Sequence, residues 1–275
     1  LGGSGSTESP QSNILSDDFY GMLDDTDGMN IGSIVDIGVG RLLISSNQIA
    51  QEQVNKIEHY MRSGSGFFTD NNVNCLDGIS SSTYGEWRTR ITSIADMEDY
   101  FTQIDHEPGY NFLKANVPDI NVNKLYMDAY NVSATVAGIR VPELNNDIEN
   151  SFYSGSLITN YVGHGGSAQL AEARLVTIPM IEDLKNADRL PLFVSATCDF
   201  TPFDDPEFLS AGERMTLNPI GGAIAMMTTT RTVYYSTNTP VVNSFYRNAL
   251  IRNANNSPRT FGEIIMHSKI TFGPA

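Results

Sequence analysis

The chain has 275 residues, a formal net charge of −15 and 40% hydrophobic residues. This composition is typical of a folded globular protein, and the strong negative charge argues against nucleic-acid binding. No apolar run approaches the roughly 20 residues of a membrane-spanning helix. We expect a single catalytic-sized α/β domain over 1–275. Its Gly- and Ser-rich start, which lacks a signal-peptide pattern, favours an N-terminally incomplete fragment.

The first third of the chain combines long loops with one clear helix. Residues 1–33 and 63–82 are rich in polar residues and glycine, which is typical of loops. Ser45 and Gln48 form a capping-box pattern that predicts a helix reaching about residue 62. Its apolar stripe is expected at three positions with helical spacing: Val54, Ile57 and Met61.

Short apolar runs alternate with amphipathic stretches along the remaining chain. The runs predict strands at 34–44, 90–95, 124–129, 156–162, 190–196 and 221–229. The amphipathic stretches predict helices at 107–115, 144–153, 178–187, 211–217, 241–250 and 261–269. Such alternation implies an α/β fold with a mainly parallel sheet and helices on both faces.

Two reactive side chains follow neighbouring predicted strands. His164 lies in Gly163-His-Gly-Gly166, directly after the strand at 156–162, and Cys198 follows the strand at 190–196. One helical crossover separates these strands, so we expect them to be adjacent. Both side chains then lie at the carboxyl edge of the sheet, where sites form. The pair predicts a cysteine nucleophile with a histidine base.

Each member of the pair also has a plain structural interpretation. A buried cysteine often acts as a small hydrophobe, and a glycine-rich turn can carry an incidental histidine. A disulfide from Cys198 to Cys75, the second of the two cysteines, would remove the nucleophile. The glycines beside His164 favour catalysis, because the backbone amides of Gly165 and Cys198 could together form an oxyanion hole.

A third group is expected to orient the imidazole. Glu98, just past the strand at 90–95, is the leading candidate, and Asp96 and Asp99 compete with it. The alternative for all three carboxylates is a solvated acidic turn.

An acidic turn near the N-terminus could bind a structural calcium ion through Asp25 and Asp27. The turn departs from the helix–loop–helix calcium pattern, so an ordinary Asp-rich turn fits it at least as well. A cysteine nucleophile requires no cofactor for its chemistry.

Several segments resemble the gingipain family of cysteine peptidases and, within it, the PorU-type sortases of the type IX secretion system. The resemblance covers most of the chain and lies in these segments: 17–25, 38–41, 160–166, 190–200, 221–225 and 228–231. Phe203-Asp-Asp-Pro206 and Ser210-Ala-Gly-Glu213 are closer to the PorU type than to the secreted gingipains.

The resemblance implies a caspase-like, gingipain-type fold with His164 and Cys198 as the catalytic dyad. Glu98 matches the acidic residue that orients the histidine in gingipains. The family also binds calcium, which supports Asp25 and Asp27 as candidate ligands. No preference for arginine or lysine follows, because the family's specificity pocket has no residue-by-residue match in this sequence.

The PorU likeness further implies a place and a reaction. Such sortases work at the bacterial cell surface, on the extracellular side of the outer membrane. They cleave the C-terminal signal domain of secreted cargo through a cysteine thioester and pass the acyl group to an amine of anionic lipopolysaccharide. Expected partners are cargo proteins with such signal domains, the anionic lipopolysaccharide and outer-membrane proteins of the secretion complex.

Two other functions stay open on the sequence. A secreted or surface gingipain-like endopeptidase would use the same thioester but release it only to water. A non-catalytic scaffold would bind cargo without cleaving it.

Overall fold

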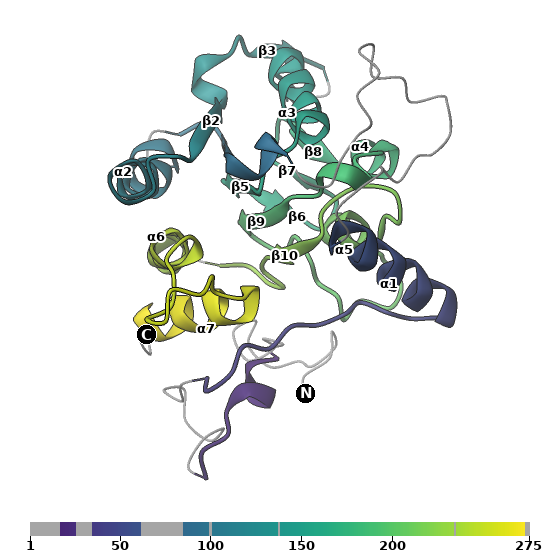
Figure 1. Ribbon diagram of the computed structural model, residues 1–275. Coiled ribbons are helices and arrows are strands. Elements are labelled where there is room, and N and C mark those ends of the chain that lie inside the picture. Colours follow the sequence, from purple (N-terminus) through teal and green to yellow (C-terminus); the bar gives the residue numbers. More distant parts are fainter. Residues whose placement is uncertain are drawn as a thin grey trace.

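A parallel sheet of five strands, in the order β10-β9-β5-β1-β2, forms the centre of the protein (Figure 1). The computed structural model describes residues 17–25, 35–61, 85–98, 101–136, 138–233 and 235–272. The five strands are β1 Arg90–Ala95, β2 Asn121–Tyr126, β5 Ile158–Val162, β9 Leu192–Ala196 and β10 Ala225–Met227. This arrangement confirms the expected α/β class.

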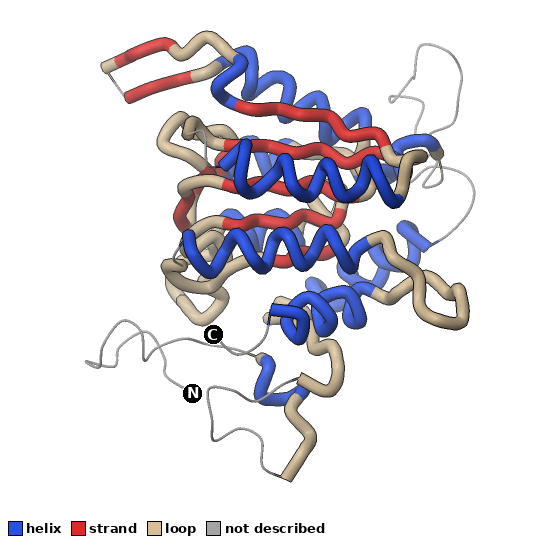
Figure 2. The backbone as a smooth tube through the Cα atoms, turned by 90° about the vertical axis from the view of Figure 1, so that its left-hand side faces the viewer, coloured by secondary structure: helices blue, strands red, loops and turns tan. Residues whose placement is uncertain are grey.

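Helices cover both faces of the sheet, as Figures 1 and 2 show. They are α1 Asn47–Met61, α2 Glu107–Asn116, α3 Pro142–Ser154, α4 Ile178–Asp183, α5 Ala211–Leu217, α6 Tyr235–Ala249 and α7 Phe261–Phe272. Short helical turns lie at Asp18–Gly21, Glu86–Thr89, Phe101–His106, Met127–Ala129 and Ala187–Arg189. None of these described helices combines the length and hydropathy needed to span a membrane.

The core has two parts, one on each side of the sheet. Residues of α3, α4 and α5 pack with Ile94, Tyr161 and Phe193 on one face. Residues of α2, α6 and α7 pack with Ile91 and Val194 on the other face. Every residue of β5 is buried, as expected for a central parallel strand that is covered on both sides.

Two small antiparallel units lie outside the main sheet, and the sequence analysis missed both. One is the hairpin of β3 Ser133–Thr135 and β4 Gly138–Arg140. The other is a three-stranded unit of β6 Gly165–Gly166, β7 Gln169–Leu170 and β8 Val176–Thr177. The strands of the second unit have two residues each, which is too short for an alternating pattern to emerge.

Most predicted elements are confirmed, with shifts at their ends. The strand at 90–95 and the helix at 211–217 match β1 and α5 in full. The strand predicted at 34–44 is wrong: residues 35–44 form no strand. The backbone at Gly38 instead lies so close to α7 that a Cβ added there would be 2.3 Å from the Gly262 carbonyl oxygen.

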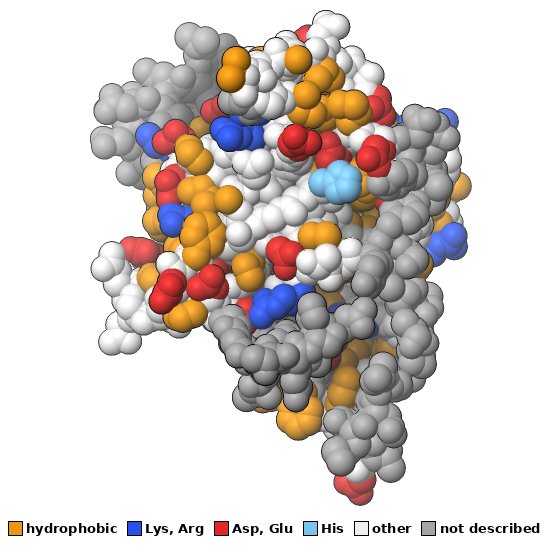
Figure 3. Space-filling view, turned by 180° about the vertical axis from the view of Figure 1, so that it is seen from behind, with side chains coloured by type: hydrophobic (Ala, Val, Ile, Leu, Met, Phe, Trp, Pro, Cys, Tyr) orange, Lys and Arg blue, Asp and Glu red, His pale blue; other side chains and the backbone are white. Residues whose placement is uncertain are grey.

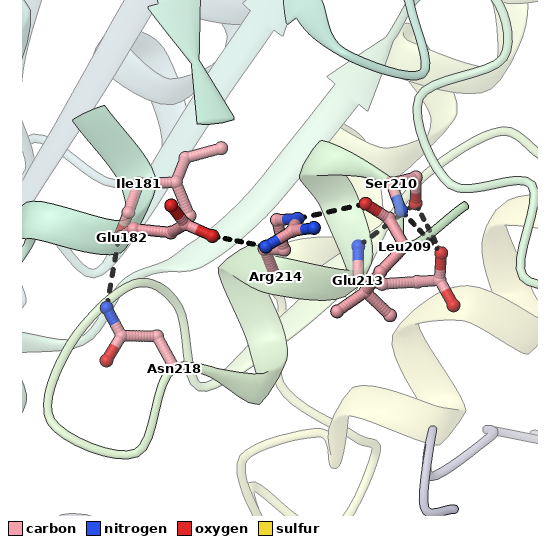
Figure 4. Close-up of polar contacts among 7 residues, drawn as sticks. All are labelled: Ile181, Glu182, Leu209, Ser210, Glu213, Arg214 and Asn218. Atoms are coloured by element: carbon pink, nitrogen blue, oxygen red, sulfur yellow. Dashed lines mark hydrogen bonds and ion pairs between the residues drawn. The ribbon is translucent and has the colours of Figure 1, made fainter. Parts of the chain in front are cut away.

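Helix α5 is fixed by a capping box and by contacts to α4 (Figure 4). The Ser210 amide and hydroxyl donate to the Glu213 carboxylate over 2.8 and 2.7 Å, and the Glu213 amide donates back to Ser210 Oγ. Arg214 pairs with Glu182 of α4, and the Asn218 side chain donates to the Ile181 carbonyl over 3.0 Å. These contacts hold α5 against α4.

Helix α1 docks through a buried lysine, which corrects the predicted apolar stripe. Its three stripe residues are exposed: Val54, Ile57 and Met61. The buried residue is Lys56, which is 2% exposed. Its ammonium donates to the carbonyl oxygens of Thr216, Asn218 and Gly221 over 2.8–2.9 Å.

The lysine contacts satisfy backbone groups that end a helix. The last carbonyls of α5 have no partner within the helix and carry partial negative charge. Burial lowers the pKa of Lys56 to about 7, while the three carbonyl acceptors oppose this shift by stabilising the ammonium. The helix begins with Ser46, not Ser45, as its cap, because Ser46 Oγ accepts from the Ile49 amide.

The exit of β5 is closely packed around a glycine. Gly163 has a φ of +155°, and a Cβ added there would lie 2.3 Å from Asp96 Cβ and 2.6 Å from the Tyr161 hydroxyl. Both neighbours are buried. A side chain at 163 therefore requires the strand end itself to move.

Replacing Lys56 with Met should lower the free energy of unfolding by about 3 kcal/mol, because three buried carbonyl oxygens lose their donor. Lys185, which is exposed, serves as the control. Lys185→Met should change stability by less than about 0.5 kcal/mol. Urea unfolding followed by circular dichroism measures both. Equal stability of the two variants would contradict the buried docking of α1.

Replacing Gly163 with Ala should lower the free energy of unfolding by about 3 kcal/mol, through overlap with Asp96 and Tyr161. Gly166→Ala is the matched control, because a Cβ at Gly166 meets nothing within 4 Å. Thermal unfolding of the two variants makes the comparison. A Gly163→Ala protein as stable as Gly166→Ala would show that the strand end is not closely packed.

Candidate active site

Strands β1, β5 and β9 end side by side, so the residues that follow them lie at the same edge of the sheet. Ala95 of β1 pairs with Val162 of β5, and Val162 pairs with Ala196 of β9. His164 and Cys198 each follow two residues after the ends of β5 and β9. The predicted adjacency of these two strands is confirmed.

The backbone of His164 is held at both its polar groups. Its amide donates to Asp96 Oδ2 over 3.1 Å. Its carbonyl oxygen accepts from the Tyr161 hydroxyl over 2.5 Å and from the Ala171 amide over 2.8 Å. The position of the Cα atom is therefore fixed by three hydrogen bonds from three different segments.

The imidazole of His164, in contrast, is open to solvent. Its side chain is 64% exposed, and one edge meets the ring of Phe101 with the centroids 5.4 Å apart. Nε2 lies 3.6 Å from Oε1 of Glu98, whose side chain is 43% exposed. This separation suits an ion pair but exceeds a normal hydrogen bond. The face in Figure 3 shows an exposed histidine beside acidic side chains.

The structure distinguishes between the acidic residues that the sequence analysis offers as partners of the imidazole. Glu98 is the one that the structure brings to the imidazole. Asp96 is buried and binds backbone amides, those of Met97 and His164. Burial raises its pKa, and the two amide donors only partly oppose this. Asp99 lies outside the described residues.

Cys198 carries a free thiol in a turn that is joined to the loop after β10. The thiol donates to the Val233 carbonyl oxygen over 3.6 Å. The next residue, Asp199, has a φ of +47°, and its amide donates to the Arg231 carbonyl oxygen over 3.3 Å. Thr229 Oγ1 also donates to the Thr197 carbonyl oxygen. The loop at 228–233 therefore determines where the sulfur lies. The other cysteine, Cys75, lies outside the described residues.

An ion pair braces this loop from its outer side. Arg231 donates through two nitrogens to the Asp204 carboxylate, which lowers the pKa of Asp204 and raises that of Arg231. Arg41 lies over the ring of the neighbouring Phe203, 4.6 Å from its centroid.

The backbone amide of Gly165 takes no part in the hydrogen bonds between β6 and β7. The Ala171 amide donates to the His164 carbonyl oxygen beside the paired residues Gly165 and Leu170. In an antiparallel ladder this makes Gly165–Leu170 a non-hydrogen-bonded pair, whose N–H groups point away from the partner strand. The Gly165 amide is thus available as an oxyanion donor, and its cooperation with the Cys198 amide stays a prediction.

Close packing also explains why a glycine is found at position 165. A Cβ added there would lie 2.5 Å from Thr197 Oγ1. Thr197 directly precedes Cys198 and is buried. The backbone of the histidine loop therefore lies against the Thr197 side chain, and this close approach requires glycine.

The calcium expectation is not tested by the described residues. Asp25 is exposed, and Asp27 lies outside the described part of the chain. Within that part, no group of three or more His, Cys, Asp or Glu side chains could hold a metal ion. Calcium at Asp25 and Asp27 stays a prediction, and no chemical step below depends on it.

A cavity of about 780 Å³ lies beside β10 and is bounded by 38–43, 224–233 and residues of α6 and α7. None of His164, Cys198 and Glu98 lines it. The cavity does border the loop at 228–233, which contacts the cysteine turn.

Sequence reasoning misses the residues that hold the backbone of His164. It places Tyr161 only within a strand and treats Asp96 only as a partner of the imidazole. The sequence does carry a signal for each residue. Tyr161 is only three residues before His164, and Asp96 is the first residue after β1. The contact between Asp96 and the His164 amide, across 68 positions, has no local signal.

The chain matches known proteins over nearly its whole length. The model of Peptidase family C25 matches residues 4–273. Comparison with curated proteins gave no match.

Solved structures share the fold. A crystal structure of the Arg-specific cysteine proteinase gingipain R (RgpB) superposes with a TM-score of 0.69 at 18% identity, covering 94% of this chain and 54% of that one. The complex of Porphyromonas gingivalis RgpB pro- and mature domains gives a TM-score of 0.67 at 18% identity, with coverages of 94% and 55%. A third structure, described as "Structure of Protease", gives 0.57 at 15% identity, with coverages of 88% and 44%.

The chain spans about half the length of the solved structures it matches. Their low identity makes them evidence for the fold, and they confirm the expected gingipain-type, caspase-like architecture. The family assignment comes from the match over 4–273, which covers almost every residue. The chain therefore belongs to peptidase family C25, the gingipain family of cysteine peptidases.

Proposed function

We propose that Cys198 is the nucleophile of this peptidase, His164 its general base and acid, and Glu98 the carboxylate that orients the imidazole. The observation that carries the proposal is the convergence of these groups at one sheet edge. His164 and Cys198 follow level ends of adjacent strands, and Glu98 lies 3.6 Å from His164 Nε2.

The proposed chemistry follows from the donors and acceptors at this edge. A proton on His164 Nε2 faces Glu98 and leaves Nδ1 to take the thiol proton. The Cys198 thiolate attacks the peptide carbonyl, and the imidazolium then protonates the departing amine. The Gly165 and Cys198 amides stabilise the oxyanion. The product of this half-reaction is a thioester on Cys198.

The second half-reaction is proposed as amine transfer. The enzyme is a PorU-type sortase that removes the C-terminal signal domain of type IX secretion cargo. It then joins the cargo to an amine of anionic lipopolysaccharide. The segments around Phe203–Pro206 and Ser210–Glu213 support this assignment, since they are closer to the PorU type than to the secreted gingipains. Both contact residues near the cysteine turn: Asp204 pairs with Arg231, and the Gly212 amide donates to the Phe200 carbonyl oxygen.

The proposed place of action is the extracellular side of the bacterial outer membrane. The partners are cargo proteins with C-terminal signal domains, anionic lipopolysaccharide and outer-membrane proteins of the secretion complex. A structural calcium ion at Asp25 and Asp27 belongs to the same proposal.

Replacing Cys198 or His164 with Ala in the full-length protein should lower cleavage of a peptide that spans the cargo signal junction by at least about 1,000-fold. Mass spectrometry of the fragments gives the rate. Normal cargo processing by Cys198→Ala would refute both enzymatic functions and favour the cargo-binding scaffold.

Replacing Glu98 with Gln should lower kcat by about 10-fold or more and leave KM within a factor of about three, because the charge that orients the imidazole is lost. Glu149→Gln, an exposed change on α3, is the matched control and should match the wild-type rate. Equal kcat values for Glu98→Gln and Glu149→Gln would contradict the proposed role of Glu98 in orienting the imidazole.

The acceptor is identified by the mass of the cargo product. With a cargo peptide and a soluble primary amine, the sortase should release an amide-linked product in addition to any acid, and Cys198→Ala should release neither. If only the free acid forms across a range of amine concentrations, the protein is a hydrolytic endopeptidase.

A further inference from the structure

One buried carboxylate joins the two turns that carry Glu98 and His164. Asp96 is 6% exposed and directly follows β1. Oδ1 accepts from the Met97 amide over 2.8 Å, and Oδ2 accepts from the His164 amide over 3.1 Å. Met97 immediately precedes Glu98, so a single side chain connects both turns.

The backbone of Asp96 is itself part of the sheet. Its amide donates to the Val162 carbonyl oxygen over 3.1 Å, which extends the pairing of β1 and β5 by one residue. Its Cβ lies against Gly163, where there is no room for a side chain. The carboxylate is therefore anchored to the rigid part of the fold, and the two turns are anchored to the carboxylate.

The imidazole of His164 needs this kind of support. Its side chain is 64% exposed, so packing does not hold it in place. Its backbone is fixed by Asp96 at the amide and by Tyr161 and Ala171 at the carbonyl oxygen. The exposed imidazole is thus positioned through the hydrogen bonds that the His164 backbone makes.

Stability alone does not explain a carboxylate at this position. Burial raises the pKa of Asp96, so the ionised form is held in the fold against a desolvation penalty. What the carboxylate provides is two acceptor oxygens for two amides in different turns. An uncharged side chain such as Asn has only one acceptor oxygen.

We propose that Asp96 is a positioning residue whose carboxylate sets the spacing between His164 Nε2 and the Glu98 carboxylate. The proposal rests on the function proposed above for His164, Cys198 and Glu98. Asp96 takes no direct part in proton transfer, because both oxygens bind backbone amides and the side chain is buried. Displacements of about 1 Å can cost about 100-fold in rate.

The first test replaces Asp96 with Asn, which keeps the size of the side chain but turns an NH2 group toward one of the two amides. We expect kcat for the cargo peptide to fall about 10- to 100-fold and KM to change less than about threefold. Alkylation of Cys198 by iodoacetamide should slow in parallel. Asp188→Asn is the matched control, because Asp188 is 7% exposed and lies far along the chain, where it pairs with His59. It should keep the wild-type kcat.

The second test separates positioning from a general structural role. If Asp96 acts by placing Glu98 and His164, Asp96→Asn should cost at least about fivefold less in kcat when Glu98 is already Gln. Additive losses in this double-mutant cycle would overturn the proposal. So would a wild-type kcat for Asp96→Asn in a protein whose Cys198→Ala variant is inactive.

Failure of the proposed function has a different signature. In that case Cys198→Ala cleaves as well as the wild type, and Asp96 has no reaction to position. If Asp96→Asn folds poorly, Asp96→Ser replaces it in the test. The serine hydroxyl is smaller and can still accept a hydrogen bond from one of the two amides. Circular dichroism of each variant establishes the fold before rates are compared, and Asp96→Ser should show the same non-additivity with Glu98→Gln.

Discussion

The level pairing of β1, β5 and β9 is the constraint on which the site depends. Ala95, Val162 and Ala196 lie side by side, so the residues that follow them emerge at one height. A slip of one residue in either pairing would turn His164 or Cys198 to the opposite face of the sheet. Both faces of β5 are buried, so a slip would also exchange the side chains that pack on the two sides of the sheet.

The site combines an exposed reactive group with a buried support. In the proposed function a polypeptide must reach the imidazole of His164, so tight packing of that side chain is excluded. The structure meets both demands by fixing the backbone of His164 through Asp96, Tyr161 and Ala171. The glycines at 163 and 165 belong to the same solution, since each allows a close approach that a Cβ would prevent.

The sequence reveals those features whose cause is local. Strand 90–95 and helix 211–217 are found in full, because an apolar run or a capping box lies within the segment itself. Lys56 shows the opposite case: helical periodicity assigns a lysine to the solvent side, and only the carbonyl ends of α5 explain its burial. The link from Asp96 to the His164 amide also depends on a partner far away in the chain. The adjacency of the strands that precede His164 and Cys198 could be predicted, because strand order follows from one crossover, whereas the support of the His164 backbone could not.

The residues that most favour the PorU type are structural braces. Ser210 and Glu213 cap α5, and Asp204 pairs with Arg231 of the loop that holds the cysteine turn. They support the turn of the proposed nucleophile and leave the choice of acceptor to other groups. Because the His164 side chain is open to solvent, water can reach the proposed thioester. An amine must therefore react as a bound neighbour, and well-oriented neighbours reach effective concentrations of about 10⁵ M or more. Transfer by this site thus requires an acceptor held against the exposed face around His164, and the proposed sortase function depends on that contact.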